Sequence, residues 1–167
     1  MILIIAASDG QNLELSRQLS NVSKELNIPH QLVQLSALDL PLYCVAAELK
    51  GIPEKAKWLQ SKMSEAQGFI LVAPEYNGSL PPLLNNSIAW VSRCGSENWR
   101  AAFAKKFAAL ATHSGGGGAK VLAAMRVQLE HLGCNILARQ ILTTPSVPLK
   151  LESAKDVLLE LAKYCKV

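Results

Sequence analysis

The chain lacks an apolar run long enough to cross a bilayer, since its apolar stretches are far shorter than the roughly 20 residues that a spanning helix needs. Residues 1–7 are apolar, but no basic residue precedes them and no small-residue cleavage site follows, so they do not resemble a signal peptide. Their length suits a first buried strand. We therefore expect a protein that does not enter a membrane.

Closely spaced cysteines are also missing. The four cysteines, Cys44, Cys94, Cys134 and Cys165, are far apart and form no Cys-x-x-Cys pair. This spacing provides neither a metal site nor a redox dithiol, so we expect no bound metal. Free thiols are typical of a reducing compartment, and they predict a cytoplasmic protein.

Basic blocks and aromatic residues are scarce as well. The net charge is +4, but the positive residues are scattered, and aromatic residues make up only 5% of the chain. A nucleic-acid-binding protein usually has a basic stripe with aromatic residues, so we expect no nucleic-acid partner. The mild positive charge suits anionic substrates such as nucleotide phosphates.

What the chain does contain is a regular alternation of apolar strands and amphipathic helices. We predict strands at residues 2–7, 31–35, 69–73, 107–112 and 136–142, and helices at residues 12–26, 53–66, 81–91, 118–132 and 154–164. Strands separated by helices pair in parallel, and strongly aliphatic strands fit a sheet that is covered on both faces. The 167 residues are expected to form one domain, residues 1–167.

Three polar or glycine-rich loops follow the first, third and fourth predicted strands. In open parallel sheets these loops meet at the carboxyl edge, where ligands bind. The first loop contains Ser8, Gly10, Gln11 and Asn12 and runs into a helix, so its backbone N–H groups can hold a phosphate. Ser8 or Asn12 is equally suited to cap that helix without any ligand.

The second loop, residues 74–81, has a tyrosine that could lie against a flat ring and an asparagine that could bond its polar edge. Glu75 is open to three interpretations, which are a ligand contact, a contact with a partner chain and a solvated carboxylate. The third loop, residues 112–119, holds four consecutive glycines that let the backbone approach a ring or a phosphate closely. His113 in this loop is either a site residue or a histidine that is hydrogen-bonded locally.

Residues 74–90 read PEYNGSLPPLLNNSIAW, and this stretch resembles the signature of the NADPH-dependent FMN reductase family, a flavodoxin-like group. The family pattern is P-E-Y-N, Gly or Ser, then P, L, a basic residue and N-A-I-D-W. The matching residues are Pro74, Glu75, Tyr76, Asn77, Ser79, Pro81, Leu84, Asn86, Ile88 and Trp90. Asn85 and Ala89 depart from the usual Lys and Asp. The third loop resembles the family's S-x-G-G-x-G-G pattern, and residues 39–43 resemble its D-L-P-x-Y stretch.

The first loop departs from the family pattern. Ala7, Gly10 and Leu13 occupy the positions where the pattern has Gly, Arg and Ser, and the Arg and the Ser are phosphate ligands there. Asp9 adds a negative charge nearby. These departures predict weaker phosphate binding or a substitute basic residue elsewhere.

The resemblance covers residues 1–142 and implies an α/β, flavodoxin-like three-layer sandwich with a five-stranded parallel sheet in the order 2-1-3-4-5. It implies FMN as the cofactor and NADPH or NADH as the electron donor, with hydride passing through the flavin to a free flavin, a quinone, an azo compound or a metal oxyanion. No catalytic side chain is expected, because the cofactor carries the chemistry. The predicted cofactor-binding residues are Ser8, Gly10, Gln11, Asn12, Pro74, Glu75, Tyr76, Asn77, His113, Ser114, Gly115, Gly116 and Gly117.

Two other functions stay open at this point. A flavodoxin-like binding or interaction protein with weakened FMN affinity would explain the departures in the first loop. An electron carrier of the flavodoxin type is disfavoured by the isoelectric point near 8.9, since those carriers are usually acidic.

We also expect a homodimer or homotetramer. The helix at residues 81–91 carries more apolar side chains than one sheet-facing stripe needs, namely Leu83, Leu84, Ile88, Trp90 and Val91, and Trp99 and Phe103 extend this surface. Family members often assemble with the flavin near a subunit boundary. Arg93 or Arg100 could then reach a partner's cofactor and replace the missing loop arginine, or both could be solvated.

Overall fold

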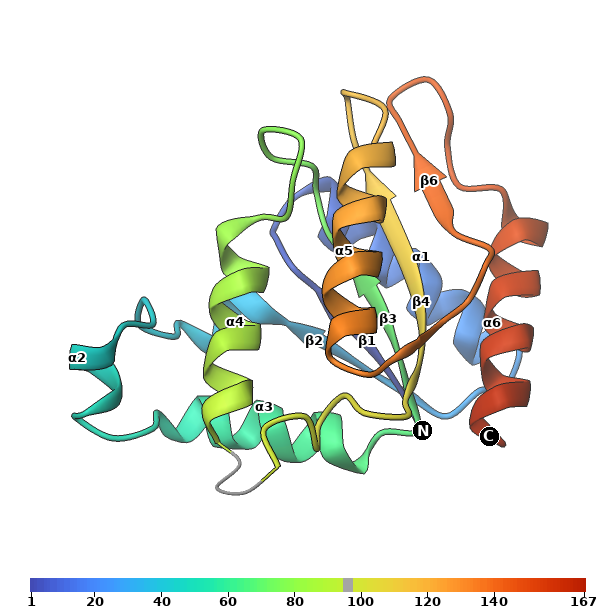
Figure 1. Ribbon diagram of the computed structural model, residues 1–167. Coiled ribbons are helices and arrows are strands. Elements are labelled where there is room, and N and C mark those ends of the chain that lie inside the picture. The colour runs from blue at the N-terminus through green and yellow to red at the C-terminus, as the bar shows by residue number, and fades with distance from the viewer. Residues whose placement is uncertain (95–97) are drawn as a thin grey trace.

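The computed structural model describes residues 1–94 and 98–167 and has a parallel sheet between two layers of helices (Figure 1). The strands are β1 (Ile2–Ala6), β2 (His30–Gln34), β3 (Gly68–Val72), β4 (Phe107–His113), β5 (Asn135–Ile136) and β6 (Ile141–Thr143). The strand order is β2-β1-β3-β4-β5, and β6 also pairs with β4. The predicted order is confirmed, and β1 lies directly beside β3 in parallel, as expected.

Five long helices, all those named below except α2 and η1, follow the predicted positions closely. The helices are α1 (Gln11–Glu25), α2 (Val45–Glu48), α3 (Glu54–Glu65), α4 (Pro82–Arg93), α5 (Ala119–His131) and α6 (Leu151–Cys165), with a short 3-10 helix η1 (Leu35–Leu38). The sequence did not predict α2 and η1, because an element of four residues is too short to show a helical period. Within the described residues, no helix is both long and apolar enough to span a membrane.

The sheet is buried on both faces because its central strands are aliphatic throughout. Every residue of β1 and of β3 is buried. Since successive side chains of a strand point to opposite faces, Leu3 and Ile5 pack among residues of α3, α4 and α5, while Ile2 and Ile4 pack among residues of α1 and α6. This arrangement leaves the loops at the carboxyl edge of the sheet free for a ligand.

The predicted last strand, residues 136–142, is wrong because the structure divides it in two. β5 pairs with Phe107 and Ala108, and β6 pairs with the far end of β4. Between them, the guanidinium of Arg126 donates to the carbonyl oxygen of Leu137 at 2.8 Å, and Arg139 forms an ion pair with Asp156 of α6. The Leu137 N–H still donates to the carbonyl of Ala108 at 2.9 Å, and residues 138–140 leave the ladder, so the sheet has six strands instead of the five predicted.

Candidate functional site

The loops after β1, β3 and β4 lie together at the carboxyl edge of the sheet, at the opposite end from both chain termini (Figure 1). Direct contacts join them. The hydroxyl of Thr112 donates to the carbonyl oxygen of Ala73 at 2.7 Å, and the backbone N–H of Ala73 donates to the carbonyl of Ala111 at 3.1 Å. The structure therefore places the three predicted loops at one edge.

The first loop presents the start of α1. Gly10 precedes the helix with φ 66° and ψ −136°, a backbone conformation that favours glycine, and a Cβ built there would have no neighbour within 4 Å. The first N–H groups of any helix lack an intrahelical partner, so the turn that begins at Gln11 can bind an anion through its backbone. The Ser8 hydroxyl donates locally, to the carbonyl of Asp9 at 3.0 Å.

Asp9 brings a fixed negative charge to this loop. Its Oδ1 accepts from the side-chain amide of Gln34 at 2.7 Å and from the hydroxyl of Ser36 at 2.6 Å. These two contacts hold the carboxylate toward the end of β2. The loop therefore combines favourable helix N–H groups with an unfavourable acid for a phosphate.

Asn12 is buried, and its side chain forms hydrogen bonds within the protein. Its Nδ2 donates to the backbone carbonyl of His113 at 2.9 Å, and its Oδ1 accepts from the His113 N–H at 2.8 Å. Both ends of the amide are therefore engaged, which leaves the backbone N–H of Asn12 for any ligand. Asn12 does not cap its own helix, so the N-cap alternative for this residue is wrong.

The second loop folds into a tight turn. Tyr76 and Ser79 exchange backbone hydrogen bonds at 3.1 and 3.0 Å, and the two residues between them, Asn77 and Gly78, have φ values of 52° and 72°. Two consecutive positive φ values are typical of a type I′ turn, for which Asn-Gly is the favoured sequence. Pro74 is buried at the base of the loop, whereas the Tyr76 side chain is 51% exposed and available to a flat ligand.

Glu75 links the second loop to the third. Its Oε2 accepts from the backbone N–H of Val121 in the first turn of α5 at 3.3 Å, and its Oε1 lies 3.5 Å from a Cβ built on Gly116. A carboxylate is stabilised at a helix N-terminus by the free N–H groups and the helix dipole. The structure thus adds to the three interpretations of Glu75 a fourth role, a structural contact within the chain.

The third loop opens its glycine backbone to the outside. Cβ atoms built at Gly115 and Gly117 would have no neighbour within 4 Å, so a ligand can approach the backbone there. Gly118 differs, because it has φ +74° and a Cβ there would lie 2.7 Å from the Thr112 side chain. The Ser114 hydroxyl accepts from the Gly116 N–H at 3.2 Å and so shapes the loop.

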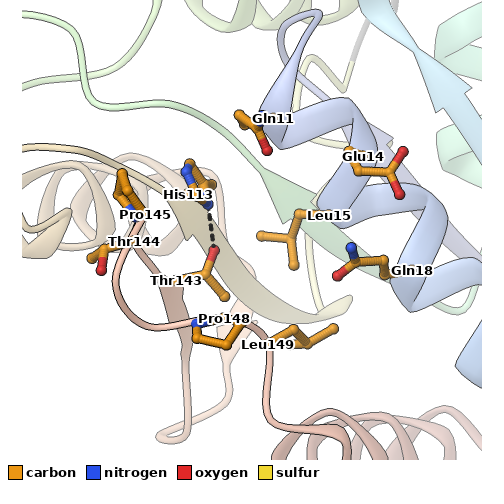
Figure 2. Close-up of a pocket in the computed structure, with 10 residues that line it drawn as sticks. All are labelled: Gln11, Glu14, Leu15, Gln18, His113, Thr143, Thr144, Pro145, Pro148 and Leu149. Atoms are coloured by element: carbon orange, nitrogen blue, oxygen red, sulfur yellow. Dashed lines mark hydrogen bonds between the residues drawn. The ribbon is translucent and has the colours of Figure 1, made fainter.

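The ring of His113 points away from the second loop. Its Nδ1 lies 3.1 Å from Oγ1 of Thr143 in β6 (Figure 2). The Thr143 hydroxyl also lies 3.2 Å from the carbonyl oxygen of Thr112, and when it donates its proton there it accepts from His113 Nδ1–H. In the neutral ring this leaves Nε2 without a proton, as a hydrogen-bond acceptor.

His113 and Gln11 both line a cavity of about 400 Å³ between α1 and residues 143–149, which we call the strap (Figure 2). The strap follows β6 and turns back on itself through hydrogen bonds between Thr144 and Val147. The strap was not predicted from the sequence to be part of a site. Its only signals are the turn formers at residues 144–148, which read Thr-Pro-Ser-Val-Pro.

Lys120 is a second residue that the sequence analysis missed. A Cβ built on Gly78 would lie 3.2 Å from Cδ and 3.9 Å from Nζ of Lys120, so this ammonium group lies against the second loop. Its position in the first turn of α5, directly after the glycine-rich loop, was the available signal.

Three of the four thiols are poor nucleophiles. Burial raises the pKa of Cys134 to about 12, and burial is also the main reason why the pKa values of Cys94 and Cys165 are raised. A raised pKa keeps a thiol protonated and unreactive at neutral pH. Residues 1–94 and 98–167 contain no group of three or more His, Cys, Asp or Glu side chains that could hold a metal ion.

Comparison with known proteins agrees with this arrangement. A family model described as NADPH-dependent FMN reductase matches residues 1–147. The quinone reductase of Escherichia coli (strain K12) is 39% identical over 59 residues, which are 35% of this chain and 31% of that protein. The matched segments span between 29% and 54% of the length of the curated relatives compared.

Solved structures show the fold. The flavoenzyme NAD(P)H:(acceptor) oxidoreductase FerB from Paracoccus denitrificans superposes with a TM-score of 0.75 at 21% identity, over 99% of this chain and 94% of that one. The two-electron reduced flavodoxin of Megasphaera elsdenii has a TM-score of 0.66 at 11% identity, over 96% and 99% of the two chains. The predicted flavodoxin-like fold is thus confirmed.

Proposed function

Since the chain belongs to the NADPH-dependent FMN reductase family, we propose that it is an FMN-dependent oxidoreductase that takes hydride from NADPH or NADH and reduces a small acceptor. The acceptor is a free flavin, a quinone, an azo compound or a metal oxyanion. The observation that carries the proposal is the convergence of three loops at the carboxyl edge of the sheet, one with open glycine backbone and another with an exposed tyrosine.

The residues present fit FMN. At one end of the edge, the backbone N–H groups of the first turn of α1, from Gln11 to Leu13, would hold the phosphate. At the other end, the exposed ring of Tyr76 and the open backbone at Gly115 and Gly117 would hold the flavin ring. Ser8, Pro74, Asn77, Ser114 and Gly116 remain predicted contacts that shape or flank these two surfaces.

Bound FMN supplies the hydride chemistry, and so the chain needs no acid–base pair of its own. Its side chains bind, orient and shield. Asn12 and Glu75 fix the spacing of the three loops, because each bonds the backbone of the third loop or of the helix that follows it. Tyr76 and the glycines then provide the surfaces between which a flat ring fits.

The alternative function is a flavodoxin-like binding or interaction protein with weakened FMN affinity. Asp9 favours it, because its carboxylate is held in the loop where the family pattern binds phosphate. Gly10, in the place of the pattern's Arg, removes a positive charge from the same loop. Lys120 offers a positive charge, but beside the second loop instead of the first.

Titration of FMN into the purified protein, followed by NADPH and NADH oxidation assays with a panel of acceptors, separates the two functions. Quenching of flavin fluorescence together with acceptor-dependent oxidation supports the oxidoreductase. FMN binding without oxidation by any acceptor supports the alternative. A protein that binds no FMN contradicts the proposed oxidoreductase, and the alternative would then hold only as an interaction protein.

We further propose a homodimer or homotetramer, although only Leu83 and Trp99 of the apolar surface predicted for it are exposed or partly exposed. Leu84, Ile88, Trp90, Val91 and Phe103 are all buried within the chain, so α4 has little apolar surface left over. Three strongly exposed apolar side chains lie together around α2, where Leu42, Val45 and Leu49 are 78%, 68% and 83% exposed. A symmetric contact would bury this patch.

Arg93 is placed close to that patch. Its guanidinium lies 5.7 Å from the ring centre of Tyr43, which packs edge-on against Trp90. Arg100 instead lies over the ring of Trp99, at 4.5 Å. Arg93 is therefore the better candidate to reach a partner's cofactor. Sedimentation of wild type and of Leu49→Glu tests the assembly, because the charge should release monomers. A monomeric wild type with FMN present contradicts both ideas.

The remaining proposal is a cytoplasmic location. All four cysteines are free thiols in the structure, as is typical of a reducing compartment.

A further inference from the structure

The cavity between α1 and the strap forms a second place where a small molecule can bind. Its volume of about 400 Å³ falls in the range of about 300–1,000 Å³ that is usual for ligand pockets. Helix α1 provides one wall, the strap provides the opposite wall, and His113 lies between them (Figure 2). The second loop, residues 74–81, takes no part in it, so the cavity is separate from the surface proposed for the flavin ring, and it meets the proposed phosphate site only at Gln11, whose side chain lines it.

The polar lining of the cavity includes two hydrogen-bond acceptors, beside amide and hydroxyl groups that both donate and accept. Nε2 of His113 is an acceptor in the tautomer whose Nδ1–H is donated to Thr143. The Glu14 carboxylate accepts only, and it keeps acceptor capacity because its contact with Arg17 is a single exposed ion pair at 3.7 Å. Gln11 and Gln18 complete the α1 side with amides that both donate and accept.

The remaining lining is apolar and flat. Leu15 is buried in the wall formed by α1, and Pro145, Pro148 and Leu149 face it from the strap. Proline rings and leucine side chains pack well against the faces of an aromatic ring. No lysine or arginine lines the cavity, and Glu14 would repel an anion at its rim.

We propose that this cavity binds a neutral aromatic molecule that carries hydroxyl donors, of the phenol and dihydroxybenzene class. The ring lies between Leu15 and the strap, and its hydroxyl groups donate to His113 Nε2 and to the Glu14 carboxylate. This site is independent of the proposed FMN chemistry, and the protein binds such a ligand with or without the cofactor.

The probe for a direct test is 1,3-dihydroxybenzene, which resists oxidation, titrated into the ¹⁵N-labelled protein and followed by amide shifts. For eight non-hydrogen atoms we expect a dissociation constant on the order of 1 mM, with shifts in α1, at His113 and in the strap. The matched probe is 1,3-dimethoxybenzene, which has the same ring but no donors and should bind about tenfold more weakly.

Two variants test the acceptors. Glu14→Ala should weaken binding about fivefold to tenfold, and Glu25→Ala, which removes an exposed carboxylate from the far end of the same helix, should leave it unchanged. His113→Phe keeps a ring but removes Nε2 and should weaken binding to a similar extent.

Absence of saturable shifts up to about ten times the expected dissociation constant overturns the site. Equal binding of the dimethoxy probe, or equal loss in Glu14→Ala and Glu25→Ala, overturns the donor–acceptor assignment. The same titration in saturating FMN should give unchanged affinity, and competition between the two ligands overturns the independence of the cavity. Failure of the protein to bind FMN bears only on the proposed function, because the probe is titrated without cofactor first.

Discussion

Asn12 and His113 are 101 residues apart in the sequence and are joined by a pair of hydrogen bonds. One side-chain amide meets both backbone polar groups of a single residue, which fixes the start of α1 against the end of β4. The first and third loops therefore keep their spacing before any ligand binds. The amide provides a structural link at a position that the sequence presents as a ligand contact.

Replacing Asn12 by Ala should cost about 1–3 kcal/mol of folding stability, because the His113 N–H and carbonyl would lose their buried partners. FMN affinity should fall as well, since the two loops would no longer be held at one spacing. Urea unfolding and FMN titration measure these effects. Asn21→Ala, at an exposed position of the same helix, is the control, and an equal loss there would contradict the link.

An arginine at Gly10 should change stability and affinity in opposite directions. The φ of 66° and ψ of −136° suit glycine, so a side chain should cost about 1–3 kcal/mol of stability. The guanidinium should nonetheless tighten FMN binding about tenfold or more, because a charge-assisted bond to phosphate contributes roughly 1.5–3 kcal/mol. Gly10→Ala carries the same backbone cost without the charge. Equal FMN affinity of the two variants would show that no phosphate lies near residue 10.

Leucine at Gly115 should block the flavin ring with little loss of stability. A Cβ there has no neighbour within 4 Å, and the backbone is not in a left-handed conformation. Gly116→Leu should weaken FMN binding too, but it should also lower the melting temperature, because its side chain grows toward the Glu75 carboxylate at 3.5 Å. Thermal melts without FMN and binding titrations give both quantities. Undiminished FMN binding by Gly115→Leu would place the ring elsewhere.

Alkaline pH should destabilise the protein through Cys134. Burial raises the pKa of this thiol from 9.0 to about 12, so the folded chain keeps a proton that the unfolded chain loses. The contribution of this thiol to the free energy of unfolding is fully present below about pH 9 and is lost as the pH rises toward 12. The loss is at most about 1.4 kcal/mol per pH unit. The difference between the urea midpoints of wild type and Cys134→Ala should therefore stay constant below about pH 9 and narrow as the pH rises above it. Parallel pH profiles would rule out this thiol as the cause.

The order of the sheet and the edge that carries the loops could be predicted from the sequence, because both depend on local patterns. Aliphatic runs such as Ile2–Ala6 and Gly68–Val72 are buried on both faces, and only a covered parallel sheet accommodates them. The Asn-Gly pair at residues 77–78 likewise predicts a tight turn, because both residues adopt the positive φ that such a turn needs.

Contacts between distant residues could not be predicted in the same way. The break in the last strand depends on Arg139 meeting Asp156 and on Arg126 meeting the Leu137 carbonyl, and neither partner is marked in the sequence. The direction of the His113 ring depends on Thr143, which lies 30 residues further along the chain. The sequence indicated that Asn12 and His113 are near a site, but not that they bond to each other.

Because the last strand is broken in two, part of the sheet can open without unfolding the whole protein. β6 is attached to the sheet through three residue pairs at the end of β4, whereas β3 is bonded along its length to strands on both sides. A short edge segment can detach at a free-energy cost well below that of global unfolding. Hydrogen exchange should therefore be faster in β6 and the strap than in β3, and the strap wall of the cavity can open while the core stays folded.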